Sequence, residues 1–169
     1  RPVKCGEVSH SSGALRRSFS GVSKSSSETN LSFRSSGLIL TLNGKVGQRV
    51  KKGQLLGRLD QKDALISYEK SKVNLSNMEV QYENSNSNLD RYKRLYETNN
   101  ASLSDYENAK SSYSNAESNF KSAKRALQLQ KSQIEYTEII APMNGIISQV
   151  SAEVNEFAQA GEPVMVMSS

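Results

Sequence analysis

The chain has 169 residues and is 36% hydrophobic and 7% aromatic, which is lean for one compact core and favours an elongated molecule. Its 22 basic and 17 acidic residues give a net charge of +5, but the two signs are mixed along the middle of the chain. Because no basic block is interleaved with aromatic residues, nucleic-acid binding is not expected.

The first 30 residues are rich in serine and contain short alternating stretches at 3–8 and 15–22. Such alternation is typical of strands, so we expect one or two strands here. Cys5 is the only cysteine, which rules out an internal disulfide, and a lone thiol in such a stretch is usually a small buried apolar residue. No apolar run approaches the ~20 residues needed to cross a bilayer, so the protein is either soluble or has lost its export signal and anchor.

Residues 31–60 alternate apolar and polar residues between glycines, which predicts a small β-segment. The region that follows is different in kind. No glycine occurs between Gly57 and Gly145, and no proline occurs between Pro2 and Pro142. A long region without either helix breaker predicts helix, and its polar composition confines the apolar residues to a narrow stripe.

This stripe repeats every seven residues in two registers, as in a coiled coil. In the first arm, 61–98, the repeating positions are Tyr68, Leu75, Tyr82, Leu89 and Tyr96. In the second arm, 103–134, they are Tyr106, Tyr113, Phe120, Leu127 and Ile134, accompanied by Ala109, Ala116 and Ala123. Between the arms lies a polar stretch suited to a turn, in which Ser102 or Ser104 caps the next helix. We therefore expect an antiparallel hairpin over 61–134, about 50 Å long, in which large first-arm residues face second-arm alanines.

Residues 135–169 return to the strand pattern and repeat the first β-segment at a spacing of 108 residues. This shift superimposes Gly37 on Gly145 and Gly53 on Gly161, and we assign all four to turns of the two β-halves. Each half is too short to bury its apolar face alone. The halves should pack on each other, which brings the two feet of the hairpin together.

A β-half, two heptad arms and a second β-half, in that order, resemble the periplasmic adaptors of tripartite efflux pumps. These are the HlyD-like membrane fusion proteins that serve RND and some ABC transporters. The stretches 31–37 and 46–55 are similar to the first lipoyl half of that family, and 140–145 to the start of the second. The resemblance implies an α+β fold, a lipoyl-like β-sandwich or barrel-sandwich hybrid interrupted by a long antiparallel coiled-coil hairpin. It also implies that residues 1–30 belong to a partial β-barrel and that the chain is part of a longer protein.

Arg91, Leu95 and Ser102 match the spacing with which this family binds TolC-like outer-membrane channels at its hairpin tip. Through the resemblance, Arg91 would donate hydrogen bonds to channel carbonyls or carboxylates, Leu95 would be an apolar knob, and Ser102 would allow close approach. The alternative is that Arg91 is merely solvated, Leu95 packs within the hairpin and Ser102 only caps the helix.

The resemblance further implies a periplasmic location, with an inner-membrane anchor in the full-length protein, and three kinds of partner. These are an inner-membrane transporter, a TolC-like channel, and further copies of the chain in a ring that is commonly hexameric. Arms of about five heptads resemble those of RND adaptors more than those of ABC adaptors. The transported substrate is left open.

Catalysis, a cofactor and a metal are not expected. His10 is the only histidine, and no nucleophile can be paired with a base. A second hypothesis is a lipoyl or biotinyl carrier domain of an enzyme complex. Such domains present a modifiable lysine in a β-turn, whereas here a helical insert takes that place and Lys62 stands at the start of a helix. A third hypothesis is a coiled-coil scaffold without a pump.

Overall fold

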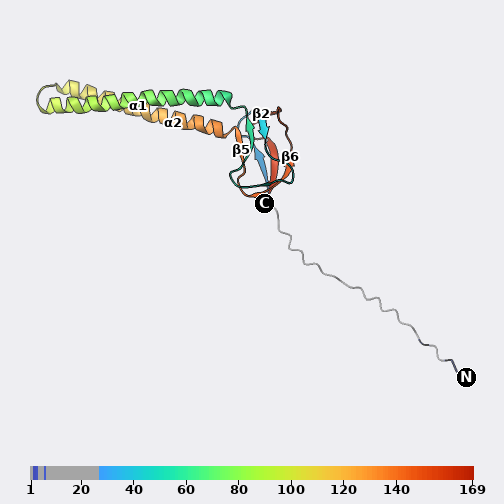
Figure 1. Cartoon of the computed structure of the whole chain (residues 1–169). Helices are drawn as coiled ribbons and strands as arrows, with labels where there is room; N and C mark the ends of the chain where they lie inside the picture. Colours follow the sequence, from blue (N-terminus) through green and yellow to red (C-terminus); the bar gives the residue numbers. More distant parts are fainter. Residues whose placement is uncertain (1, 4–5, 7–26) are drawn as a thin grey trace.

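The computed structural model describes residues 2–3, 6 and 27–169. It consists of a small β-domain and a long helical hairpin that projects from one side of it (Figure 1). The expectations for Cys5, His10 and the strands at 3–8 and 15–22 fall mostly or wholly outside the described residues.

The β-domain is built from two antiparallel four-stranded sheets with the orders β1-β8-β6-β3 and β5-β4-β2-β7. The strands are β1 Glu28–Ser32, β2 Gly37–Leu42, β3 Arg49–Val50, β4 Leu55–Leu59, β5 Glu138–Ile140, β6 Gly145–Val150, β7 Phe157–Ala158 and β8 Pro163–Ser168. Each sheet combines strands from both sides of the hairpin, which confirms that the two halves fold on each other. β1 begins at Glu28, before the boundary expected at residue 31, and pairs with β8.

The repeat of 108 residues is also a structural pseudo-symmetry. It relates β2 to β6, β3 to β7 and β4 to β8, so that one sheet order maps onto the other. The turns correspond as well, since Gly47 and Asn155 have φ of 85° and 71°, and Gly53 and Gly161 have φ of 86° and 82°. Positive φ favours glycine and tolerates asparagine, which explains the residues at these four turn positions.

Gly37 and Gly145 do not lie in turns, contrary to the expectation from the sequence. They are the first residues of β2 and β6, and neither has a positive φ. The glycine at 145 is needed for close packing, because a Cβ there would overlap with the Ser168 carbonyl oxygen and lie 2.8 Å from Met167 Cε.

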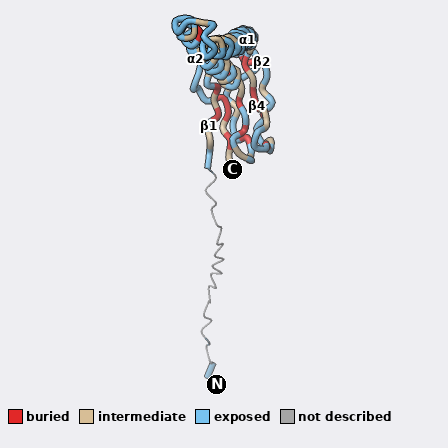
Figure 2. The backbone as a smooth tube through the Cα atoms, turned by 90° about the vertical axis from the view of Figure 1, so that its left-hand side faces the viewer, coloured by how far each residue is buried: buried red, intermediate tan, exposed pale blue. Residues whose placement is uncertain are grey.

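The buried core lies almost entirely between the two sheets (Figure 2). Complete burial of a large apolar side chain stabilises a fold by about 1.5–3 kcal/mol. The largest fully buried side chains are Phe33, Ile39, Leu56, Leu59, Ile147, Met165 and Met167. Among the helical residues only Ala109 and Ala123 are buried, so most of the folding energy resides in the β-domain.

The hairpin consists of α1, Lys62–Glu97, and α2, Leu103–Glu135. The 36 residues of α1 span about 54 Å at a rise of about 1.5 Å per residue. The predicted antiparallel pair of helices is thereby confirmed (Figure 1).

Aromatic rings meet across the seam between the helices. Tyr82 stacks on Phe120 with ring centroids 5.3 Å apart, and Tyr96 stacks on Tyr106 at 5.5 Å. Both pairs fit one antiparallel register, which sets the heptad positions of the two arms opposite each other. The expectation that large residues face alanines was therefore wrong for these pairs. Large residues share layers with large residues, and the buried alanines lie in the layers between them.

A hydrogen bond joins two tyrosine hydroxyls in this seam. Tyr82 and Tyr113 Oη atoms are 3.2 Å apart, and the ring centroids are 5.6 Å apart. This hydrogen bond, with a smaller contribution from burial, raises the pKa of Tyr113 to about 12.

Candidate functional site

The free end of the hairpin is closed by a tight turn with several backbone hydrogen bonds. Asn99 adopts φ of 58° just after α1. The Asn100 N–H donates to the Leu95 carbonyl at 2.7 Å, and the Asn99 N–H donates to the Tyr96 carbonyl at 3.1 Å. These two bonds form a Schellman motif, with asparagine in the left-handed position that glycine usually takes. The chain thus reverses direction while the carbonyls of residues 94–96 in the last turn of α1 stay paired.

Ser102 caps the second helix, as one of the two expected candidates. Its hydroxyl accepts from the Asp105 N–H at 3.0 Å, and the Asp105 carboxylate accepts from the Ser102 N–H at 3.3 Å. This reciprocal pair is a capping box, a feature worth about 1 kcal/mol to a helix. The tip is thus held at both helix ends and presents a defined surface.

The three residues of the expected channel-binding motif have different environments. Arg91 is exposed, its guanidinium donates to the Asn88 side-chain oxygen, and it lies 5.7 Å from the Tyr92 ring centroid. Leu95 is only half-buried, and its carbonyl forms part of the turn. Ser102 is exposed, with its hydroxyl engaged in the cap. Leu95 and Ser102 flank the turn, whereas Arg91 lies one helical turn before Leu95 on α1.

Two apolar residues at the tip were not singled out as surface residues from the sequence. Leu103, the first residue of α2, is 51% exposed, and Tyr96 is 39% exposed although its ring stacks on Tyr106. The signal for Leu103 was available, because an apolar residue next to an N-cap and outside the heptad stripe has no partner in the hairpin. Together with the exposed guanidinium, these residues give the tip a mixed apolar and cationic surface suited to another protein.

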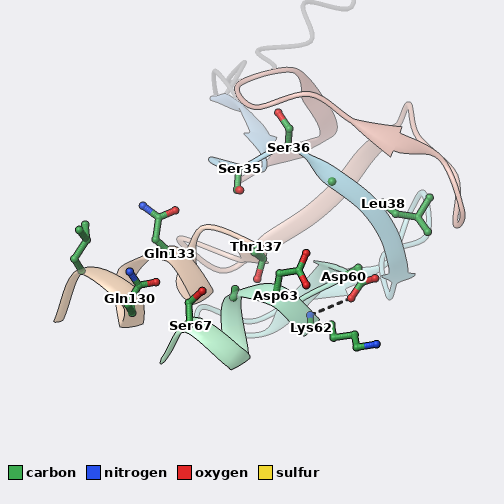
Figure 3. A pocket seen from close by; sticks show the side chains of 13 residues that line it. Ser35, Ser36, Leu38, Asp60, Lys62, Asp63, Ser67, Gln130, Gln133 and Thr137 are labelled. Carbon is green, nitrogen blue, oxygen red and sulfur yellow. Dashed lines mark hydrogen bonds between the residues drawn. The ribbon is translucent and has the colours of Figure 1, made fainter. Parts of the chain in front are cut away.

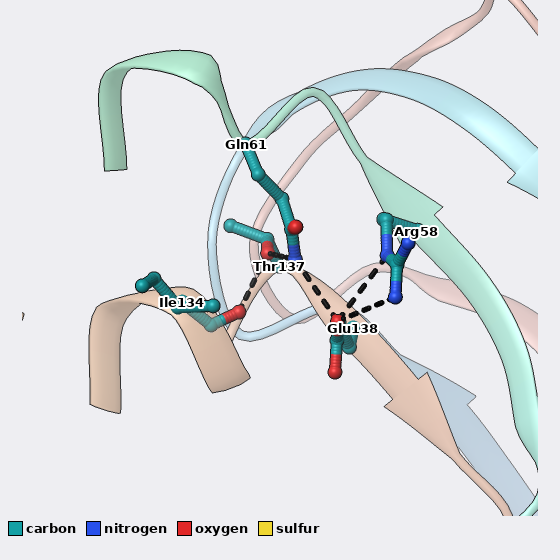
Figure 4. Close-up of polar contacts among 5 residues, drawn as sticks. All are labelled: Arg58, Gln61, Ile134, Thr137 and Glu138. Atoms are coloured by element: carbon teal, nitrogen blue, oxygen red, sulfur yellow. Dashed lines mark hydrogen bonds and ion pairs between the residues drawn. The ribbon is translucent and has the colours of Figure 1, made fainter. Parts of the chain in front are cut away.

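At the other end of the hairpin, a polar cluster joins its two feet to the β-domain (Figure 4). Gln61 donates to Thr137 Oγ1 at 2.8 Å and to Glu138 Oε1 at 3.0 Å. Thr137 is buried, with 5% of the residue exposed, and its hydroxyl donates to the Ile134 carbonyl at 2.6 Å. Arg58 forms an ion pair with Glu138 at 3.0 Å. The entry to α1 and the exit from α2 are thus locked to each other.

A polar hollow of about 780 Å³ lies beside this junction, where β2, the start of α1 and the end of α2 meet (Figure 3). Its lining includes Asp60, Asp63, Ser67, Gln130 and Gln133. Within the described residues, no group of three or more His, Cys, Asp or Glu side chains is arranged to hold a metal ion. The hollow contains no nucleophile paired with a base, so it offers no chemistry that we can assign.

Lys62, the candidate for a carrier lysine, is the first residue of α1. Its N–H donates to the Asp60 carboxylate at 3.0 Å, which starts the helix (Figure 3). A lysine in a helical first turn is not the β-turn lysine that carrier domains present. Of the described helices, none is both long enough and apolar enough to span a membrane.

Comparison with known proteins places the fold. Residues 28–168 match a family model described as the barrel-sandwich hybrid domain of RND MFP. A Bacteroides eggerthii protein assigned as an efflux transporter is 30% identical, over 85% of this chain and 40% of that chain, with a TM-score of 0.59. None of the curated proteins matches the chain closely enough to count as a relative.

Two further structures share the fold at lower identity. A MacA–MexA chimera carrying the Pseudomonas aeruginosa MexA α-hairpin domain is 23% identical over 84% of this chain and 48% of that chain, with a TM-score of 0.61. ZneB from Cupriavidus metallidurans is 19% identical over 83% and 60%, with a TM-score of 0.60. The chain thus spans between 40% and 60% of the length of these three structures. Since the family model covers nearly all of the described β-domain and hairpin, the chain belongs to the RND membrane fusion proteins and contains their barrel-sandwich hybrid domain.

Proposed function

We propose that the chain is the adaptor subunit of a tripartite efflux pump in the periplasm, and that it performs no catalysis. In this proposal its hairpin reaches a TolC-like outer-membrane channel, and other parts of the full-length protein contact an inner-membrane transporter. Family membership supports the adaptor class. The observation that carries the finer proposal is the rod of about 54 Å, which ends in an exposed, hydrogen-bonded tip with a cationic side chain that has no carboxylate partner among the described residues.

The chemistry of the tip supports a protein partner. Arg91 has no carboxylate partner within 4 Å among the described residues, so its guanidinium is available to carbonyl or carboxylate oxygens of a channel. Tyr96 and Leu103 add exposed apolar area, and Leu95 adds the part of its side chain that the hairpin leaves open. Ser102 is small, so it permits close approach of the channel backbone. A cation beside apolar anchors is the usual composition of a binding hot spot.

An RND transporter is the proposed inner-membrane partner. The matching family model is that of RND membrane fusion proteins, and each arm of the hairpin carries about five heptads. We further propose that several copies of the chain, six in the simplest ring, surround a common axis. In this arrangement the hairpins lie side by side and present their tips together to the channel.

The test is a double substitution at the tip, Arg91→Glu with Leu95→Ser, in the full-length protein in its own cell. We expect loss of drug efflux and of chemical cross-linking to the channel, with helical circular dichroism retained, because the tip contributes recognition and little folding energy. Arg91→Glu alone should cause most of the loss of efflux. This single variant leaves the half-buried Leu95 in place, so its effect does not come from a loosened hairpin.

Two matched controls separate recognition from stability. Arg125→Glu reverses an exposed arginine on the shaft of α2, and Leu89→Ser removes a half-buried leucine from the seam. Arg125→Glu should retain more efflux than Arg91→Glu, and Leu89→Ser should retain more efflux than the double variant. Efflux and cross-linking that survive the double substitution would refute the tip as the channel-binding site.

A further inference from the structure

The two β-halves share one backbone design but carry opposite charge. Residues 31–60 contain six lysines and arginines and one aspartate, whereas the corresponding residues 139–168 contain three glutamates and no basic residue. The basic residues include Lys45, Lys51 and Lys52, all exposed, and the glutamates 153, 156 and 162 are exposed as well. The charge of this β-domain is therefore divided between its two pseudo-symmetric halves.

Folding does not require this division, because corresponding turns make the same hydrogen bonds. The Lys45 N–H donates to the Gln48 side-chain oxygen at 3.0 Å, and the Glu153 N–H donates to the Glu156 carboxylate at 2.9 Å. The Gln54 N–H donates to the Lys51 carbonyl at 3.0 Å, and the Glu162 N–H repeats this bond with residue 159 at 3.2 Å. Neutral and acidic side chains thus serve the same turn equally well. The geometry of the turns therefore does not explain the charges.

The turns at 51–54 and 159–162 lie at opposite edges of the domain. The turn at 51–54 follows the edge strand β3, and the Gly53 N–H donates to the Ala141 carbonyl at 2.9 Å. The turn at 159–162 follows the edge strand β7, and the Gly161 N–H donates to the carbonyl of Phe33, just after β1, at 2.9 Å. Because β1 and β3 are the outer strands of the same four-stranded sheet, the two turns are about 14 Å apart or more.

Charged side chains at each edge lack an ion-pair partner among the described residues. Arg49, Lys51 and Lys52 at the β3 edge have no carboxylate within 4 Å among the described residues, and neither Glu156 nor Glu162 has a basic partner. Phe157, which corresponds to Arg49 in the repeat, is 60% exposed and lies opposite Leu38 in the β2–β7 pair. The acidic edge thus carries an exposed aromatic ring and unpaired carboxylates, groups that attract lysine and arginine.

We infer that the basic β3 edge of one copy docks against the acidic β7 edge of the next copy, so that charge sets a head-to-tail order among barrel-sandwich domains. A contact between two different edges is heterologous and propagates around a ring or along a chain of copies. An anionic membrane would use only the basic edge and would leave Phe157 and its flanking glutamates without a partner. This inference rests on the proposed adaptor function, since it specifies how the copies in the ring meet.

The test exchanges turn residues between the halves, so that each new turn already exists in this fold. The basic variant gives the turns of the second half the charged residues of the corresponding turns of the first, and the acidic variant does the reverse. The basic variant is Glu153→Lys, Glu156→Gln, Gln159→Lys, Ala160→Lys and Glu162→Gln, and the acidic variant is Lys45→Glu, Gln48→Glu, Lys51→Gln, Lys52→Ala and Gln54→Glu. Association of the 169-residue chain is measured by sedimentation velocity, for each variant alone and for an equimolar mixture.

We expect the parent chain to self-associate, and its dissociation constant to rise about tenfold or more between about 0.1 M and about 1 M salt, as the Debye length falls from about 10 Å to about 3 Å. Each variant alone should associate about tenfold or more weakly than the parent, because two like edges then face each other. The mixture should regain parental affinity, since one variant supplies a basic edge and the other an acidic one. Recovery on mixing also shows that both variants are folded.

Three results would overturn the inference: a parent chain that stays monomeric, variants that associate as the parent does, or a mixture that regains nothing. Suppose that the parent binds phosphatidylglycerol vesicles, and that the acidic variant loses this binding but associates as the parent does. The partner of the basic edge would then be a membrane and not a second copy of the chain. Arg91→Glu should associate like the parent. If efflux depends on Arg91 while the exchanged turns have no effect, the adaptor function stands and the charge-ordered contact falls.

Discussion

Gly145 and Gly37 occupy the same position in the two β-halves, yet only one of them has room for a side chain. A Cβ at Gly145 would overlap with the Ser168 carbonyl oxygen, which is backbone and cannot rotate away, and would lie 2.8 Å from Met167 Cε. A Cβ at Gly37 would lie 3.6 Å from Leu59 Cδ1, an ordinary contact. The same substitution should therefore have different consequences at the two sites.

We expect Gly145→Ala to lower the free energy of unfolding of the β-domain by about 1–3 kcal/mol, because β6 and β8 must move apart to admit the methyl group. Gly37→Ala should be neutral or stabilising by up to about 1 kcal/mol, because alanine restricts the unfolded chain and causes no clash in the folded one. The pair is a matched control, since both glycines begin a strand and both have negative φ.

Hydrogen exchange followed by mass spectrometry is the suitable assay, because helical signals from the hairpin dominate circular dichroism. Peptides covering β6 and β8 should exchange roughly 5- to 140-fold faster in Gly145→Ala, since about 1.4 kcal/mol corresponds to tenfold. The same peptides in Gly37→Ala should exchange at or below the parental rate. Equal rates in the two variants would show that close packing is not what selects glycine at 145.

Two further substitutions probe the junction and the seam. Thr137→Val should destabilise the hairpin base by about 0.5–1.5 kcal/mol, because the Gln61 amide and the Ile134 carbonyl each lose one of their hydrogen bonds in a partly buried setting. Faster exchange confined to the last turn of α2 and the start of β5 would show this, and unchanged exchange there would contradict it. The Tyr113 pKa of about 12 predicts a contribution to hairpin stability that is complete below about pH 10, the usual tyrosine pKa, and is lost as the pH rises through 12. In Tyr82→Phe, ultraviolet titration should find the Tyr113 pKa lowered toward its usual value, whereas a pKa still near 12 would refute the hydrogen bond as its cause.

The heptad pattern predicted which residues face the partner helix but not which partner residue each of them meets. Spacing along one helix reports its own face, whereas the pairing depends on the length and geometry of the turn between the arms. The turn here is closed by the Schellman motif at Asn99 and the capping box at Ser102, and this closure sets the register in which Tyr82 lies against Phe120. For the same reason the sequence placed Leu95 at the tip but did not show that it is half-buried and that Leu103 is the more exposed leucine.

From sequence alone, the order of β-half, helical hairpin and β-half could be determined, as could the faces of the helices and the equivalence of the two halves. These properties are local, because glycine, proline and hydrophobic spacing act within one element. The tertiary structure decided how strands of the two halves alternate within each sheet, why Gly145 must lack a side chain, and that the two charge groups lie at opposite edges. Each of these depends on contacts between separate segments, β6 with β8 for Gly145 and segments on either side of the hairpin for the sheet order and the charged edges, and no spacing within one segment encodes such contacts.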